Sequence, residues 1–315
     1  MLRALDFLRL HSLPPRPAVV ASALTQYVAT GLLVGGAYAL MSIGLALIFG
    51  VMRVVNFAQG DFMMLGMYLT YFYAVGLGID PLLGAVVTIP PFFLLGLLVH
   101  RVFLARVTGG GDPSREMDAQ LILTLGLSLI ITNATTMILS PTPRGIRTTY
   151  ATQAFAIGPV LLNQARTYAF LMALLLAAAM YVFLTRTDLG KALRAAADDP
   201  EAASYQAINV RAMHGVAFGV GIALVAAAGG LLATYYPIEP NVGVNFIVLM
   251  FVAVVLGGLG SIPGAFVGGI VIGLVQSLTL LVLPLQLQNV GVFVAFLVVL
   301  YVRPQGLFGR RARTV

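Results

Sequence analysis

The chain has 315 residues, of which 60% are hydrophobic and only 9% are charged. A typical soluble domain carries about 25% charged residues, so this composition excludes an ordinary soluble enzyme and a disordered protein. The chain has no Cys, which excludes disulfides and thiolate metal sites, and its three His residues lie far apart. The net charge of +7 comes almost entirely from Arg, which favours contact with anionic lipid headgroups over nucleic acid.

Long apolar runs dominate the sequence, and crossing the hydrocarbon core takes about 20 apolar residues as a helix. The runs are continuous, whereas barrel strands would alternate in polarity. We therefore predict an all-α integral membrane protein, a polytopic bundle of eight to ten transmembrane helices with Gly- and Pro-broken segments. The charge-free runs, of which the last two have room for four crossings, are 19–52, 62–79, 81–99, 119–143, 167–185, 215–238 and 240–302.

The ends of the chain carry clustered Arg, which sets the predicted orientation. Residues 1–18 are expected to form a cytoplasmic or interfacial segment, 19–303 the transmembrane domain, and 304–315 a cytoplasmic tail. Two cytoplasmic termini require an even number of crossings. Because the run 19–52 is punctuated by Gly, we expect it to cross twice, or once with a re-entrant half.

A polar junction, "RVVNFAQGD", separates the first two apolar runs and contains Asn56, Gln59 and Asp61. Asp61 is a candidate N-cap for a helix that starts at Phe62. Charges within membrane segments are costly and mark functional sites, so the junction is equally a candidate polar path or gate. The sequence leaves both interpretations open.

A stripe of polar residues follows in the run 119–143, where Gln120, Thr124, Ser128 and Thr132 recur every four residues. Such residues lie near one face of a helix. Ser and Thr in spans often serve only in packing, so the stripe indicates either a helix contact or a hydrophilic path.

The loop 186–213 predicts a helix–turn–helix on the cytoplasmic face. Asp188 is the expected cap of its first helix. Asp199 is the expected N-cap of the second, followed by Pro200 and by Glu201 in the first turn. The alternative is a solvated connector.

The late run 244–283 is broken at "GGLGSIPG" (257–264), which contains Gly260 and Ser261. Short hydrophobic segments interrupted by Gly or Pro point to the substrate path in transporters. The chain has no P-loop, so it has no ATPase site of its own, and no catalytic or metal-binding residue is expected. Buried carboxylates are scarce, which argues against ion coupling.

Five motifs in order resemble the branched-chain amino acid ABC transporter permeases, the membrane subunits of high-affinity hydrophobic amino acid importers. The resemblance covers nearly the whole chain. The motifs are "GLLVGGAYALMSIGLALIFGVMRVVNFAQGDFMMLGMY" (31–68), "LTLGLSLIITN" (123–133), "GKALRAAADDPEAASYQAINV" (190–210), "AVVLGGLGSIPGAFVGGIVIGLVQSL" (253–278) and "RPQGLFG" (303–309).

The resemblance implies a division of labour in a prokaryotic inner membrane. A second permease chain, identical or different, would complete the path, two cytoplasmic ATPase subunits would use ATP, and an extracytoplasmic binding protein would deliver substrate. This chain itself would bind no cofactor. The expected substrate-path residues are Asn56, Gln59, Asp61, Thr124, Ser128, Gly260 and Ser261. The expected ATPase-coupling residues are Gly190, Lys191, Arg194, Ala195, Asp198, Asp199, Glu201 and Arg211.

Three positions depart from the family pattern. The family typically has His at position 59, often Glu at 61 and commonly Gly at 207, where this chain has Gln59, Asp61 and Ala207. The departures keep an alternative substrate open, urea or short amides. Two other classes are also weighed: an ion-coupled secondary carrier and a passive channel, either of which would work without partner subunits.

Overall fold

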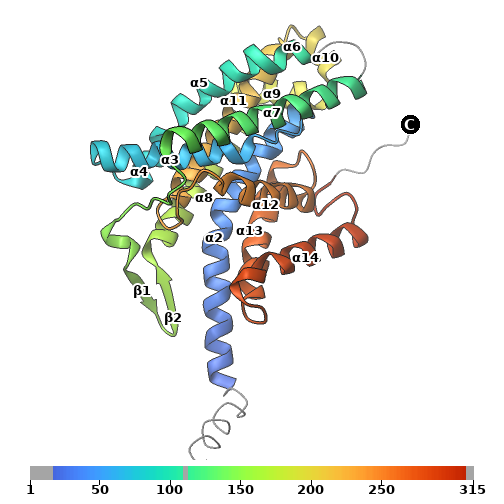
Figure 1. The fold of residues 1–315 in the computed structure, drawn as a ribbon. Helices are drawn as coiled ribbons and strands as arrows, with labels where there is room; N and C mark the ends of the chain where they lie inside the picture. The colour runs from blue at the N-terminus through green and yellow to red at the C-terminus, as the bar shows by residue number, and fades with distance from the viewer. Residues whose placement is uncertain (1–16, 109–112, 310–315) are drawn as a thin grey trace, which may run out of the picture.

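The computed structural model describes residues 17–108 and 113–309. Helices form nearly all of its regular structure, which confirms the predicted all-α membrane fold (Figure 1). The helices are α2 (Pro17–Met52), α3 (Gln59–Leu77), α4 (Pro81–Val87), α5 (Ile89–Val99), α6 (Ala105–Val107), α7 (Pro113–Leu139), α8 (Gln164–Arg186), α9 (Asp188–Asp198), α10 (Pro200–Tyr205), α11 (Val210–Leu232), α12 (Val242–Gly257), α13 (Ile262–Thr279) and α14 (Gln288–Val302). Short elements are the π-helical turn η1 (His100–Leu104), the 3-10 turns η2 (Thr149–Ala151) and η3 (Leu285–Leu287), and the antiparallel strands β1 (Ala154–Ile157) and β2 (Val160–Asn163).

Seven helical stretches of the described chain are long and apolar enough to cross a membrane. They are Ser22–Met52, Pro81–Val107, Arg115–Leu139, Gln164–Arg186, Val210–Leu232, Ile262–Thr279 and Leu285–Val302. The helix α12, with 16 residues, is a shorter apolar helix, and α3, with 19, is long enough to span but less apolar than these seven. The count of eight to ten crossings stays a prediction.

The first apolar run is one uninterrupted helix of 36 residues, α2, so the expectation that it turns back within the membrane is wrong. Early in α2, the Gln26 side chain exchanges two hydrogen bonds with the backbone of Leu161 in β2, each 2.8 Å long. Farther along, α2 contacts α9. The 23-residue helix α8 runs from β2 to α9, so the two ends of α2 lie at opposite ends of the molecule (Figure 1).

We call these the hairpin end, around β1 and β2, and the α9–α10 end. The C-terminal segment lies at the α9–α10 end: Leu307 N and Phe308 N donate to Leu256 O and Gly257 O at 2.8 and 3.0 Å. In contrast, α2 begins at the hairpin end. Residues 1–16 lie outside the described part, so the prediction that both termini are cytoplasmic stays a prediction. The predicted division at 18/19 falls inside α2.

The glycines that suggested breaks in α2 are points where neighbouring helices touch its backbone. Gly31 and Gly35 lie against α13, and Gly44 lies against α11. A Cβ added at Gly31 would come within 2.9 Å of Gly273 O. Because small residues let backbones approach, they are the usual means of packing helices in lipid. Glycine here favours helix contacts and does not interrupt the helix.

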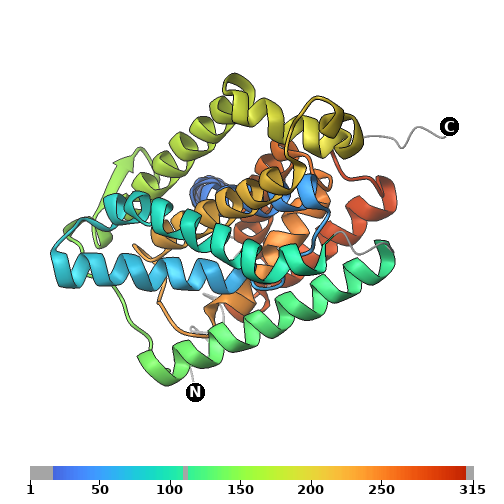
Figure 2. The ribbon, with the colours of Figure 1, turned by 90° about the horizontal axis from the view of Figure 1, so that it is seen from above.

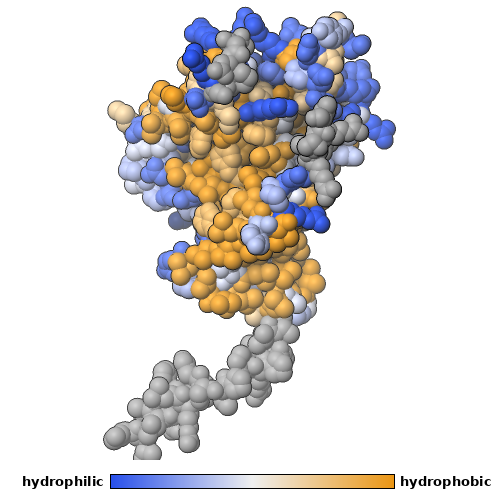
Figure 3. Space-filling view, turned by 90° about the vertical axis from the view of Figure 1, so that its right-hand side faces the viewer, coloured by the Kyte–Doolittle hydropathy of each residue, from blue (hydrophilic) through white to orange (hydrophobic). Residues whose placement is uncertain are grey.

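Close backbone approach at glycines also joins the other central helices. Gly96 of α5 faces Gly219 of α11, and Gly60 of α3 faces Gly243 of α12. Seen from above, α2 lies near the middle of the molecule, with α7 along one edge (Figure 2). An apolar belt covers much of the side of the molecule, and hydrophilic residues gather at the upper end, where Figure 1 places α6 and α10 (Figure 3).

The predicted helix–turn–helix in 186–213 is confirmed as α9 and α10. Asp199 caps α10 by accepting from Glu201 N and Ala202 N, each at 3.0 Å, and Pro200 opens the helix as expected. The cap of α9 is Thr187, whose hydroxyl accepts from Gly190 N at 3.0 Å, so the assignment of Asp188 as cap is wrong by one residue. Ala207, which follows α10, has a φ of 58°. Gly adopts this conformation without steric cost, so the Gly that the resemblance leads us to expect here would fit with less strain than Ala207.

Substituting Gly66 of α3 tests the close packing. A Cβ there would collide with the backbone of Ala226 in α11, whereas a Cβ at Gly76 of the same helix would meet open space. We expect Gly66→Ala to destabilise the folded protein by about 1–3 kcal/mol. Gly76→Ala is the matched control and should be neutral or slightly stabilising because Ala favours helix. Thermal unfolding in detergent, followed by circular dichroism, measures both. Equal midpoints for the two variants would contradict the packing.

Candidate functional site

In the polar junction at the start of α3, the side chains of Asn56, Gln59 and Asp61 are buried, whereas Arg53 is exposed. Most of the buried polar atoms are used locally. Asn56 Nδ2 donates to Gln59 Oε1 at 2.8 Å, while Asn56 Oδ1 accepts from Ala58 N at 3.1 Å. Asn56 therefore shapes the turn into α3. Gln59 Nε2 has no hydrogen-bond partner among the described residues. A buried unpaired donor is costly, so Gln59 is the junction residue with a donor available for a ligand.

Asp61 lies in the first turn of α3, because the helix starts at Gln59 rather than Phe62. It is therefore not the N-cap. Its carboxylate accepts from Thr132 Oγ1 at 2.7 Å and also interacts with the Ser128 hydroxyl. Thr124 Oγ1 lies 3.4 Å from Val55 O. The polar stripe of α7 thus faces the junction, as a hydrophilic helix contact.

The helix α7 is otherwise weakly held. Large apolar side chains on it are exposed, among them Ile122, Leu129 and Met137. Besides the bonds to Asp61 and Val55, Gln120 Nε2 donates to Thr108 Oγ1 at 3.0 Å. Apolar side chains on one side of α7, among them Leu127 and Ile131, also pack against the core. A helix with so much of its surface exposed can separate from its neighbour at low cost in packing, which suits a moving part of a path.

The second group of predicted path residues lies at the turn between α12 and α13. Ser261 Oγ caps α13 by accepting from Gly264 N at 3.2 Å. Gly260 has a φ of 78° and its backbone lies against Gly50 near the end of α2. Both residues therefore shape a tight turn at the α9–α10 end. No hydrogen bond in the described part of the chain joins this turn to the polar junction.

The predicted coupling residues lie on α9, on α10 and at the start of α11. Six of them are exposed: Lys191, Arg194, Asp198, Asp199, Glu201 and Arg211. Gly190 is buried, since its backbone packs on Phe183 and Leu184 at the corner between α8 and α9, and Ala195 is half-buried. This surface is anchored by the buried side chains of Leu193 and Ala196.

The three cations on this surface differ in whether they are paired with a carboxylate. Lys191 Nζ donates to Asp188 Oδ1 at 2.9 Å, and this contact lowers the pKa of the exposed Asp188 carboxyl. Arg194 and Arg211 have no such partner among the described residues. They are the cations of α9–α11 that remain available to a docking protein.

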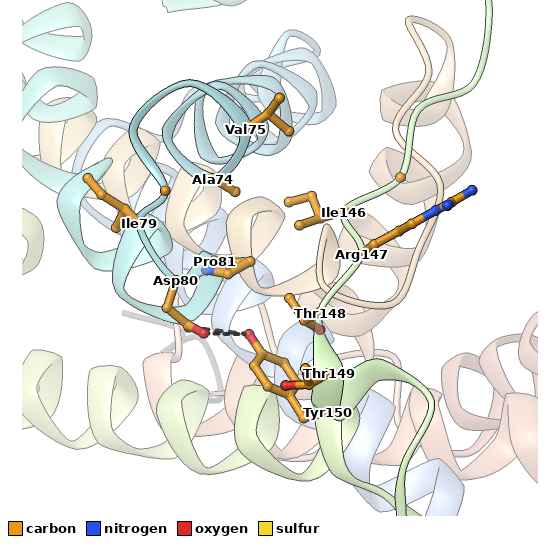
Figure 4. A pocket seen from close by; sticks show the side chains of 12 residues that line it. Ala74, Val75, Ile79, Asp80, Pro81, Ile146, Arg147, Thr148, Thr149 and Tyr150 are labelled. Carbon is orange, nitrogen blue, oxygen red and sulfur yellow. Dashed lines mark hydrogen bonds between the residues drawn. The ribbon is translucent and has the colours of Figure 1, made fainter.

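The hairpin end holds two neighbouring hollows that the sequence motifs did not predict. The segment 140–151, which we call the strap, contributes to both. The first, of about 520 Å³, lies between the strap and the start of α4, where Tyr150 Oη contacts Asp80 at 3.1–3.2 Å and Arg147 extends away from this pair (Figure 4). Burial and the nearby Asp80 charge raise the pKa of Tyr150.

The second, of about 510 Å³, lies between the strap, the start of α8 and the turn after α11. We call it the arginine hollow, because Arg144 and Arg166 line it together with Asn163, Tyr235 and Tyr236. The only signal in the sequence was that these arginines lie in 140–166, a segment between two apolar runs that carries three Arg and no acidic residue. In residues 17–108 and 113–309, no group of three or more His, Asp or Glu is arranged to hold a metal ion.

Comparisons with known proteins agree with the motifs. Residues 27–302 match the family model described as "Branched-chain amino acid transport system / permease component". The chain is 30% identical over 300 residues to the high-affinity branched-chain amino acid transport system permease protein BraD of Pseudomonas aeruginosa, covering 90% of this chain and 95% of BraD. It is 29% identical over 302 residues to LivH of Escherichia coli K12, with the same coverage of 90% and 95%. A probable branched-chain amino acid permease of Methanocaldococcus jannaschii is 29% identical over 76% of each chain.

No solved structure matches the chain. The family assignment therefore depends on sequence, and the family model covers most of the helical part, from within α2 to the end of α14. The chain is a multi-pass membrane transport protein that belongs to the permease component family of branched-chain amino acid transport systems.

Proposed function

We propose that this chain is one of two permease subunits of an ABC importer for branched-chain or other hydrophobic amino acids. The observation that carries the proposal is the family match over residues 27–302. Two separate ATPase subunits would supply ATP hydrolysis, and an extracytoplasmic binding protein would deliver the substrate. This chain would bind no cofactor. The second permease would be either another copy or a different chain.

The orientation follows from charge. The α9–α10 end carries Arg194, Arg211 and Arg303, so we place it in the cytoplasm by the positive-inside rule. The hairpin end, with the strap and the start of α2, then faces the opposite side, where a binding protein would dock. The protein would lie in a prokaryotic inner membrane with its C-terminus inside.

In this mechanism, closure of the ATPases moves α9 and α10, and α8 and α11 carry the movement into the membrane. The weakly packed α7 would separate from α3 as the path opens, so Asp61, Thr124 and Ser128 would line the path in the open state only. Gln59 offers the path its unpaired donor. Gly260 and Ser261 would set the turn against which the end of α2 moves.

Gentle extraction of the tagged chain from its native membrane, followed by mass spectrometry, tests the importer assignment. We expect an ATPase subunit and a permease chain to copurify, and the assembled complex in liposomes to import leucine only with ATP and binding protein. Urea uptake without leucine uptake would favour the alternative substrate. Uptake or flux by the chain alone, without ATP, would contradict the proposal and favour a carrier or channel.

Arg194→Ala tests the coupling surface. Because Arg194 is exposed and has no described partner, its loss should leave the fold intact while removing one charge contact to the ATPase. We expect leucine uptake to fall at least tenfold, corresponding to about 1.4 kcal/mol. ATP hydrolysis, measured in the same liposomes, should lose its dependence on binding protein. Arg101→Ala, which removes an exposed cation outside α9–α11, is the control. Equal uptake by both variants would exclude this role for Arg194.

Asp61 and Thr132 together test whether α7 separates from α3. Thr132→Val removes the hydroxyl that donates to Asp61 but keeps the shape of the side chain. If Asp61 only fastens α7, then Thr132→Val and Asp61→Asn should lower thermal stability and uptake in parallel. If Asp61 also lines the open path, we expect Asp61→Asn to lower uptake several-fold more than Thr132→Val does. Parallel losses in both measurements would remove Asp61 from the path.

A further inference from the structure

The arginine hollow at the hairpin end has the size and lining of a small-ligand site. Its volume of about 510 Å³ lies within the range of roughly 300–1,000 Å³ that such sites occupy. It is formed by segments far apart in the sequence. The strap and the turn after α11 are tied together there by paired backbone bonds between Arg144 and Ile238, 2.8 and 2.9 Å long.

Two arginines line this hollow without a paired carboxylate, Arg144 from the strap and Arg166 from α8. Arg144 Nη2 donates to Leu139 O at 2.6 Å, and its guanidinium carbon lies 5.5 Å from the centre of the Tyr71 ring. The guanidinium carbon of Arg166 lies 5.6 Å from the centre of the Tyr235 ring. Neither arginine has an ion-pair partner among the described residues. Both are half-buried, so their charges are less screened than those of the exposed Arg147.

The start of α8 adds a third positive contribution. Asn163 caps the helix by accepting from Arg166 N at 3.1 Å, and Arg166 lies in the first turn, which contains no acidic residue. The amino end of a helix is electropositive, so a cation there is unfavourable and an anion is favourable. Glu239 is the acidic residue near this site, since its charge acts on Tyr236, but no ion pair joins it to Arg144 or Arg166 among the described residues. The fold therefore concentrates net positive charge where an anion would compensate for it.

The hollow also offers a neutral donor and an apolar wall. The buried Tyr235 hydroxyl has no hydrogen-bond partner among the described residues. Burial raises the pKa of Tyr235, with a smaller opposing effect of Arg166, so the hydroxyl keeps its proton. The Tyr236 ring packs on Phe246 at a centroid distance of 5.1 Å, and Phe246 in turn contacts Tyr38 at 5.8 Å.

We propose that the arginine hollow binds the α-carboxylate of an amino acid substrate on the outer side of the membrane. Arg144 and Arg166 pair with the carboxylate, Tyr235 donates a hydrogen bond to it, and the ring of Tyr236 contacts the apolar side chain. The inference rests on the proposed function and deepens it, because it assigns the importer an entry site that reads the charged group common to all amino acids. Selection among the side chains of different amino acid substrates is left to the contact with the Tyr236 ring.

The ligand pair L-leucine and L-leucinamide tests the proposal, because the amide lacks the negative charge. Binding of each to the complete, ATP-free transporter complex is measured by equilibrium dialysis without binding protein. We expect the wild-type complex to bind leucine at least tenfold more tightly than leucinamide, since hydrogen bonds to charged groups are strong. Arg166→Gln should abolish this preference, whereas Arg147→Gln, in the strap but outside the arginine hollow, should retain it.

Tyr235→Phe is a second test variant, which removes a hydroxyl and leaves the charges of the hollow unchanged. Because its hydroxyl has no described partner, removing it should leave the thermal midpoint unchanged or slightly higher. Leucine affinity should nevertheless fall about tenfold if the hydroxyl donates to the carboxylate. A loss of stability without a change in affinity would show a structural role and would contradict the proposal.

The remaining outcomes separate the entry site from the importer itself. A complex that imports leucine with ATP but shows no preference over leucinamide overturns the entry site alone. A complex that imports no amino acid overturns the proposed function as well. If Arg166→Gln keeps the preference but loses binding of the substrate-free binding protein, the arginines dock an acidic protein surface and the entry site is wrong.

Discussion

Backbone contact between helices is the interaction on which the rest of this structure depends. In lipid, the hydrophobic effect gives little reason for one apolar helix to associate with another, so packing must come from dispersion at short range. The helix α2 achieves this with α13 at Gly31 and Gly35 and with α11 at Gly44. These contacts make α2 the buried centre of the bundle. The helices α3 and α5 pack on α11 at Gly66 and Gly96, and α12 packs on α3 at Gly243.

At the edges of this dense centre, polar bonds supplement the packing. α7 is joined to α3 by the bond from Thr132 to Asp61, and α14 is joined to α13 by the 2.8 Å bond from Gln276 Nε2 to Asn289 Oδ1. Polar bonds of this kind can exchange partners, whereas interlocked backbones cannot move without steric clash. A rigid centre with helices held at its edges by exchangeable bonds is a physical basis for alternating access.

Much of this could be predicted from the sequence, and the failures have physical causes. Hydropathy and length predicted the helical membrane fold, and the Asp199-Pro200-Glu201 pattern predicted α10, because capping is a local interaction. Local rules failed for α2, since whether a glycine breaks a helix or fits against another backbone depends on a partner distant in sequence. They failed for Asp61 because its partner Thr132 lies 71 residues away. The arginine hollow combines three segments of the chain, so only the positive charge of 140–166 between two apolar runs hinted at it.

The central claim is that α2 crosses the membrane once, separating an outer hairpin end from a cytoplasmic α9–α10 end. The chain contains no Cys, so single-cysteine variants can be labelled without background. The decisive measurement is labelling of Thr25→Cys, Arg147→Cys and Glu201→Cys in intact cells with a membrane-impermeant maleimide, at three exposed positions. The account predicts labelling at positions 25 and 147 from outside and at position 201 only after permeabilisation. Labelling of positions 25 and 201 from the same side would contradict it.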